Sequence, residues 1–284
     1  MRSCLTIDLG LIAYAEAWEL QKRVVAARKA GAIDDVLLFC EHPHVITLGR
    51  SGKRANLLAG ENVLRQKGVE YFETPRGGDI TYHGPGQIVG YPILNLGAIK
   101  RDVVWYVRML EEAMIRATAE LGIAARREEG KTGIWVPPDQ GLSQSIQKSE
   151  QAEERTAAAG ILRDSDLSKS HQSPVTSHWP LAKAVAPEKL AAIGVHISRW
   201  VTSHGFAYNV ATDLRYFELI VPCGIAERKA TSLEKLLERR VGLEEVKPLL
   251  ARHLGDVFDL QMQPAGREEL LQRLERTEQA VAVA

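Results

Sequence analysis

Cys223, in the segment VPCGI, is the residue whose surroundings most directly favour chemistry. It follows the apolar run ELIV and lies in a Pro-Cys-Gly turn, where proline fixes the preceding backbone and Gly224 lets another group approach the main chain. A thiol presented on such a turn, beside the N–H groups that follow it, is suited to act as a nucleophile next to an oxyanion site. The alternative is a free cysteine that fills the end of a strand.

Candidate partners for this thiol are a His or a Lys from elsewhere in the fold, and among the lysines Lys189 stands out. An ordinary thiol with a pKa near 8.5 is only about 3% ionised at pH 7, so a cation must stabilise the thiolate. Lys189 begins the strand-like segment KLAAIGVHIS, beside the small residues Ala191, Ala192 and Gly194. A lysine next to a narrow apolar channel is suited to acid–base chemistry. A solvated lysine at a strand edge is the alternative.

A dense glycine cluster, RGGDITYHGPGQ, runs from Arg76 to Gln87. Glycines at this density let a ligand come close to the backbone, with N–H groups pointing toward it. The cluster lacks the GK[ST] ending of a Walker loop and the Rossmann fingerprint. We therefore predict a ligand-binding loop, although structural turns alone would explain two or three of the glycines. His83 either bonds to the substrate or the catalytic pair, or braces the loop.

Two further groups of residues could form sites. Cys40, His42 and His44 alternate and would share one face of a strand, as metal ligands can, but a proline interrupts that strand, so no metal is predicted. Ser203 and His204 are adjacent but lack the GxSxG elbow of a serine hydrolase. His204 is expected to orient neighbouring backbone instead.

Composition narrows the class of protein. The 284 residues are 45% hydrophobic and 25% charged, and 36 Lys and Arg balance 36 Asp and Glu. This balance argues against a nucleic-acid partner, which basic proteins favour. Three cysteines without a CxxC pair argue against disulfides and a cysteine-rich zinc site. No apolar run reaches the length of a membrane span, and MRSCLTIDLG does not read as a signal peptide, so a cytoplasmic protein without membrane contact is expected.

Apolar spacing predicts the elements that must position these residues. Steps of three and four indicate helices, and short apolar or alternating runs indicate strands. The pattern indicates one α+β domain with a mixed, mostly antiparallel sheet flanked by helices. The predicted helices are 13–30, 103–121 and 231–254, and the predicted strands are VLLFC, HVITLGR, LAAIGVHIS and GFAYNV.

The domain is predicted to span residues 1–260. The stretch 137–187 is nearly devoid of aromatics and rich in Gln, Ser and charges, so it cannot bury enough apolar surface to offset its ordering entropy. We read it as a disordered insertion. Residues 261–284 are charged and then rich in Ala and Val, and are predicted to be a flexible tail.

Several long motifs, in this order, resemble the lipoyl(octanoyl) transferase family of lipoate biosynthesis. They are EHPHVITLGR, RGGDITYHGPGQ, GKTGIWV, KLAAIGVHISRW, HGFAYN and PCGI. The resemblance covers roughly residues 5–254 except the insertion, where family members usually have a short turn. It implies the fold of biotin and lipoate protein ligases, and an acyltransferase that needs no cofactor.

The resemblance also assigns roles by position. It implies that Cys223 carries the acyl thioester and that Lys189 lowers the pKa of its thiol. The implied donor is octanoyl-acyl carrier protein, and the implied acceptors are lipoyl domains of 2-oxoacid dehydrogenase E2 subunits and the glycine cleavage H protein. The implied acyl-binding residues are Arg76, Gly77, Gly78, Asp79, Ile80, Thr81, Tyr82, His83, Ala192, Ile193, Gly194, Gly205, Phe206 and Ala207.

Two other functions remain open at this stage. One is an ATP-dependent lipoate or biotin protein ligase on the same fold, which has no need of a catalytic cysteine. The other is a non-catalytic module that binds lipoyl domains, with the insertion as an interaction arm. The PCGI segment argues against the first, and the presence of both Cys223 and Lys189 argues against the second.

Overall fold

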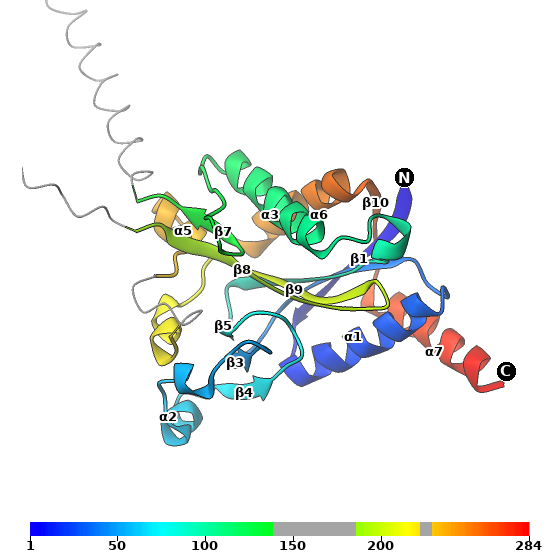
Figure 1. The fold of residues 1–284 in the computed structure, drawn as a ribbon, viewed down its shortest axis with the longest axis horizontal. Coiled ribbons are helices and arrows are strands. Elements are labelled where there is room, and N and C mark those ends of the chain that lie inside the picture. Colours follow the sequence, from blue (N-terminus) through cyan, green and yellow to red (C-terminus); the bar gives the residue numbers. More distant parts are fainter. Residues whose placement is uncertain (139–185, 222–228, 284) are drawn as a thin grey trace, which may run out of the picture.

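A computed structural model describes residues 1–138, 186–221 and 229–283 of the chain. Its main element is a seven-stranded sheet of order β10-β1-β2-β6-β9-β8-β7 (Figure 1). The pairs β10–β1 and β1–β2 are parallel and the other four pairs are antiparallel, which confirms the predicted mixed, mostly antiparallel sheet. The strands are β1 Arg2–Leu11, β2 Asp35–Glu41, β6 Gln87–Ile93, β7 Ile134–Val136, β8 Glu188–Ser198, β9 Val201–Asn209 and β10 Leu260–Pro264.

A smaller sheet of order β4-β3-β5 lies beside one end of the large one (Figure 1). It consists of β3 (Val45–Leu48), β4 (Glu70–Glu73) and β5 (Ile80–His83), and the short helix α2 (Glu61–Gln66) precedes β4. A core of its own, which includes Ile46 and Ile80, holds this sheet together. The predicted strand HVITLGR is β3, and it belongs to this second sheet.

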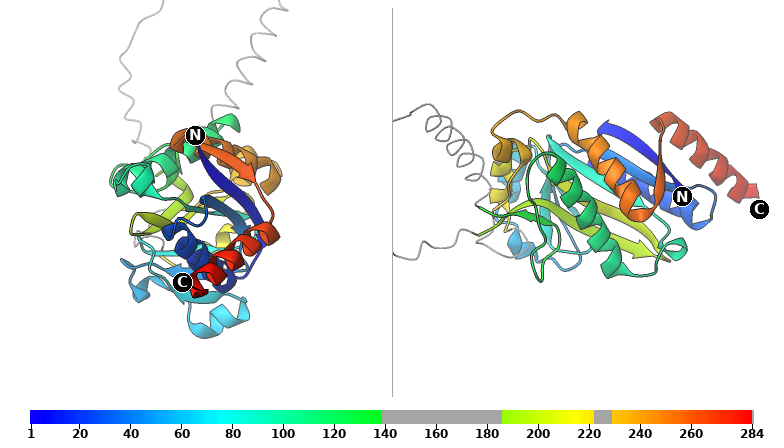
Figure 2. Two further views of the ribbon diagram at one scale, coloured as in Figure 1. Left: turned by 90° about the vertical axis from the view of Figure 1, so that its right-hand side faces the viewer. Right: turned by 90° about the horizontal axis from the view of Figure 1, so that it is seen from above.

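Helices cover both faces of the large sheet (Figure 2). One face packs against α3 (Val103–Glu120) and α6 (Leu243–Phe258), and the other against α1 (Tyr14–Lys29) and α7 (Arg267–Val283). The side chain of Asp102 caps α3 by accepting the Trp105 N–H. None of the described helices is both long and apolar enough to cross a bilayer.

The sheet–helix layers explain the burial of the predicted strand VLLFC. All of its residues are buried because β2 lies between β1 and β6 with a helical layer on each face. Helix 13–30 is confirmed as α1, and helix 103–121 as α3. The segments LAAIGVHIS and GFAYNV are confirmed within β8 and β9.

The region 231–254 departs from the predicted single helix. It forms α5 (Leu233–Leu237) and then α6, because Glu238 takes a left-handed conformation (φ 51°) and ends the first helix. Three short 3₁₀ turns complete the described elements: η1 Arg54–Asn56, η2 Leu96–Ala98 and η3 Leu214–Leu219.

The C-terminal segment also differs from the flexible tail predicted for residues 261–284. β10 pairs with β1, and α7 contacts α1 with Leu270 and Leu274 fully buried. The two leucines lie four residues apart and so share one helix face, a spacing too short to stand out in a charged tail. The predicted insertion at 137–187 falls almost wholly on residues 139–185, outside the described ranges.

Candidate functional site

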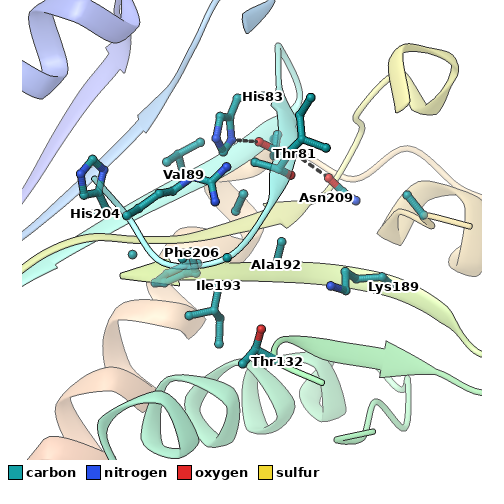
Figure 3. Close-up of a pocket in the computed structure, with 18 of the residues that line it drawn as sticks. Thr81, His83, Val89, Thr132, Lys189, Ala192, Ile193, His204, Phe206 and Asn209 are labelled. Carbon is teal, nitrogen blue, oxygen red and sulfur yellow. Dashed lines mark hydrogen bonds between the residues drawn. The ribbon is translucent and has the colours of Figure 1, made fainter. Parts of the chain in front are cut away.

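A largely apolar cavity runs along the paired strands β8 and β9 (Figure 3). The ladder pairs Ala192 with Ala207, Ile193 with Phe206, and Gly194 with Gly205. Residues of all three pairs line the cavity, so the two strands form one continuous wall. Lys189 lines the cavity near the start of β8, and His204 lines it at the other end of the row.

The loop between β4 and β5 lies over these strands, and its residues Arg76, Gly78 and Asp79 line the cavity (Figure 3). Gly77 donates its N–H to the carbonyl of Val195 on β8 at 2.8 Å. A Cβ at Gly194 would lie 2.9 Å from the Gly77 carbonyl oxygen, so only glycine lets the loop approach β8 this closely. Some of these glycines therefore allow close backbone packing between the loop and β8, in addition to any role in ligand binding.

Arg76 belongs to this loop and has only 7% of its surface exposed. Its guanidinium donates to the carbonyl oxygen of Thr47 at 2.7 Å, to the Thr47 hydroxyl at 2.9 Å, and to the Gly77 carbonyl at 3.0 Å. These bonds fix the loop to β3 of the small sheet. The guanidinium also brings a positive charge to one side of an otherwise mainly apolar cavity.

His83 is held in a polar chain that crosses three strands. Its Nδ1–H donates to Gln87 Oε1 at 2.8 Å, Gln87 Nε2 donates to Asn209 Oδ1 at 2.9 Å, and Asn209 Nδ2 donates to the carbonyl of Thr231 at 2.9 Å. Burial, with the neighbouring His42 and Arg76, lowers the pKa of His83 to about 3. The ring is therefore neutral at pH 7, and its bonds brace the loop.

Lys189 is fixed by the chain that returns toward α5. Its N–H donates to the Lys229 carbonyl and its own carbonyl accepts from the Thr231 N–H, both at 2.9 Å. Its Nζ lies 4.6 Å from the ring centroid of Trp135 on β7, a cation–π distance. Trp135 is only 2% exposed, so the lysine amine lies against a buried aromatic ring. Both residues line the edge of the apolar cavity.

A buried carboxylate, Glu111 on α3, positions the segment that carries Trp135. It accepts the N–H of Gly133 at 3.0 Å and bonds to Arg108 and Arg127 at 2.7 and 3.1 Å. Gly133 has φ +96°, and a Cβ there would overlap the carbonyl oxygen of Ala191. Glycine is thus required for β7 to approach β8 beside Lys189.

The cavity gathers most of the residues that the sequence analysis assigned to the site. Gly77 and Tyr82 do not line it: Gly77 bonds to β8, and Tyr82 points away, with its hydroxyl 2.7 Å from His44 Nδ1. Cys223 falls in 222–228, outside the described ranges. The assigned residues that do line the cavity are Arg76, Gly78, Asp79, Ile80, Thr81, His83, Lys189, Ala192, Ile193, Gly194, Gly205, Phe206 and Ala207.

Several lining residues were not assigned from the sequence. Trp135 lies in the GKTGIWV motif, which offered a signal, and His204 directly precedes the assigned Gly205. Tyr14 reads as an ordinary helix residue, and only the packing of α1 on the sheet brings it here. The unassigned lining residues are Tyr14, Gln87, Val89, Tyr91, Thr132, Trp135, His204, Asn209, Phe217, Lys229 and Ala230.

The alternating residues of the EHPHV segment are engaged in the fold. His42 donates Nδ1–H to the Ile12 carbonyl at 2.8 Å, and its Nε2 accepts from the Tyr91 hydroxyl at 2.7 Å. Burial lowers the pKa of His42 to about 4, so it is a neutral core residue at pH 7. No group of three or more potential metal ligands occurs in the described parts of the chain.

Sequence comparison finds one matching family model and relatives that cover most of the chain. The family described as the lipoyl protein ligase A/B catalytic domain matches residues 13–255. The octanoyltransferase of Solibacter usitatus is 44% identical over 264 residues, covering 93% of this chain and 97% of that protein. The octanoyltransferase of Koribacter versatilis is 43% identical over 258 residues, covering 90% and 84%.

A solved structure confirms the predicted lipoate-ligase-like fold. It is a bi-partite lipoate protein ligase from Thermoplasma acidophilum, with a TM-score of 0.65 at 14% identity, covering 97% of this chain and 91% of that one. At this identity the likeness concerns the fold alone.

Proposed function

Since the chain belongs to the family of the lipoyl protein ligase A/B catalytic domain, we propose that it moves an octanoyl group from octanoyl-acyl carrier protein to a lysine of a lipoyl domain. The chain is a transferase of protein lipoylation, like its relatives at 43–44% identity. The proposed acceptors are the lipoyl domains of 2-oxoacid dehydrogenase E2 subunits and the glycine cleavage H protein. The acyl group is carried between donor and acceptor on Cys223.

One observation carries the proposal: an amine, that of Lys189, stands at one end of an apolar cavity walled by small residues. The chain also pairs with the backbone of Lys189 from Lys229 onward, only six residues after Cys223. An acyl chain with its carbonyl near Lys189 would extend along β8 and β9. Its six methylenes, at about 0.8 kcal/mol each, would contribute a gross burial energy of about 5 kcal/mol before entropy costs.

The reaction proceeds in two acyl-transfer steps. The first moves the octanoyl group from the carrier thiol to Cys223, and the second moves it from Cys223 to the acceptor lysine. The Cys223 thiolate, stabilised by the Lys189 ammonium, attacks the carbonyl carbon of the donor thioester, and the electron pair of the C=O bond moves to oxygen. When the carbonyl re-forms, the C–S bond to the carrier breaks, and the carrier thiol leaves with a proton from Lys189. The enzyme then holds the octanoyl group as a thioester.

The second step returns the enzyme to its starting state. The neutral amine of the acceptor lysine attacks the enzyme thioester and gives a proton to the now neutral Lys189. The bond from Cys223 to the acyl carbon breaks, and the thiolate is again paired with an ammonium. Because an amide is more stable than a thioester, this sequence needs no ATP.

Intact mass spectrometry after mixing with octanoyl carrier protein tests this proposal. The wild type should gain the mass of one octanoyl group and lose it on addition of a lipoyl domain. Cys223→Ala should gain none, and Lys189→Met should gain it far more slowly at unchanged folded content. Lys131→Met is the matched control, because it removes another lysine near Trp135, and it should behave as wild type.

Two results would overturn the proposal. Full transfer by Cys223→Ala would exclude the enzyme thioester. Modification of a lipoyl domain that requires lipoate and ATP, with pyrophosphate released, would instead establish the ligase alternative.

A further inference from the structure

His204 lies at the opposite end of the cavity from Lys189 (Figure 3). It pairs with Val195 on β8, six residues beyond Lys189. At about 3.4 Å per strand residue, these six steps span about 20 Å. Figure 3 shows Lys189 directed along β8 toward Ala192, with Ile193 and Phe206 between it and His204.

This length matches a medium acyl chain. The lysine side chain takes up about 6 Å of the span, and an extended octanoyl chain of C–C bonds near 1.5 Å measures about 9 Å from carbonyl to methyl. The remaining few ångströms are filled by the thioester sulfur and the imidazole. The methyl end of the chain would therefore reach the neighbourhood of His204.

A second groove also has His204 in its wall. It lies between α1 and the β8–β9 hairpin, and its walls include Trp18, Val25, Pro75 and His196. Across the described residues, His204 is the one side chain that lines both this groove and the cavity. The cavity and the groove therefore meet at His204.

The protein holds this side chain firmly in place. His204 is 3% exposed, its backbone N–H donates to Gln21 Oε1 at 2.9 Å, and its ring centroid lies 6.1 Å from that of Trp18. Its backbone has φ +54°, an uncommon conformation for a residue with a side chain. Burial, with the nearby Arg76 charge, lowers the pKa of His204 to about 3, so the ring is uncharged at pH 7.

We propose that His204 is the end wall of the acyl cavity and sets the upper limit of acyl chain length. This inference rests on the proposed function, since it takes the acyl carbonyl to lie at Lys189. A neutral, fixed ring tolerates a terminal methyl against it but leaves no room for further carbons. Without the ring, a longer chain would continue into the groove over Trp18 and Val25.

The test compares acyl chains in a variant that the backbone accepts. His204→Gly suits φ +54° and removes only the side chain, while His204→Asn keeps a shorter side chain that also tolerates this conformation. The matched control is His196→Ala, because His196 lines the groove and not the cavity. Acyl-enzyme formation from octanoyl, decanoyl and dodecanoyl carrier protein is followed by intact mass in competition.

We expect the dodecanoyl-to-octanoyl ratio of kcat/KM to rise at least about tenfold in His204→Gly, since one methylene already changes selectivity by about that factor. His204→Asn should show a smaller rise, and His196→Ala should keep the wild-type ratio. If folded His204→Gly keeps the wild-type dodecanoyl-to-octanoyl ratio of kcat/KM, the end-wall assignment is wrong. An equal rise in His196→Ala would also overturn it.

Direct binding separates this inference from the proposed function. Calorimetric titration of the protein with free octanoate and dodecanoate measures their relative affinities without any acyl transfer. A wild type that forms no acyl-enzyme, but whose His204→Gly variant gains dodecanoate affinity, would refute the thioester chemistry and support the wall. An unchanged affinity ratio in both variants would refute the wall whatever the chemistry.

Discussion

The contact between Lys189 and Trp135 predicts a graded loss of acylation as the aromatic ring is reduced. The Nζ lies 4.6 Å from the ring centroid, Trp135 is fully buried, and Lys189 is half-buried. A cation–π contact in such partly desolvated surroundings is worth about 1–2 kcal/mol. If this energy stabilises the ammonium that supports the thiolate, its loss corresponds to about a 5- to 30-fold slower acylation.

Single-turnover acylation from octanoyl carrier protein measures this effect. Trp135→Phe keeps a weaker ring and should lose less than Trp135→Leu, so the rates should fall in the order wild type, Phe, Leu. Both variants also lose core packing, so unfolding curves must show that each is folded at the assay temperature. Lys131→Met leaves the Lys189 contact intact and should stay within about twofold of wild type, because Lys131, with its Nζ 5.5 Å from the ring centroid, takes no part in the proposed acylation.

One outcome would refute this reasoning. If folded Trp135→Leu acylates at the wild-type rate, the ring does not support the ammonium, and its place beside Lys189 reflects packing alone. A fall in Lys131→Met as large as that in Trp135→Leu would attribute the effect to general charge near the cavity instead.

Three further predictions concern the scaffold of the site. Gly133→Ala should cost at least about 2 kcal/mol of unfolding free energy in urea titrations, because its φ is +96° and a Cβ would overlap the Ala191 carbonyl, whereas Gly130→Ala, with open space around it, should cost about 1 kcal/mol. Leu274→Ala should cost about 2–5 kcal/mol if α7 is part of the folded domain; a loss below 0.5 kcal/mol would mean that the helix is dispensable. The buried His83 has a pKa near 3 in the folded chain and about 6.5 when unfolded, so its contribution is fully present above pH 6.5 and falls by about 1.4 kcal/mol per pH unit toward pH 3; His83→Gln should show a correspondingly shallower loss of stability with acid.

Local patterns predicted the helices α1 and α3 and the strands β2, β3, β8 and β9. The four-and-three spacing in 13–30 and 103–121 predicted α1 and α3, because a helix that covers a sheet must bury one stripe. Small residues in KLAAIGVHIS and GFAYNV predicted two strands able to line a channel. These signals depend on residues that are close together in the sequence, so they can be recognised without knowledge of the tertiary structure.

The contacts across the sheet required the folded chain. The sequence offered no reason for Trp135 to lie against Lys189, 54 positions later, or for His204 to line both the cavity and the groove. The same holds for α7, whose two buried leucines make sense only against α1. Strand order decides which residues become neighbours, and strand order depends on long-range pairing that no local spacing encodes.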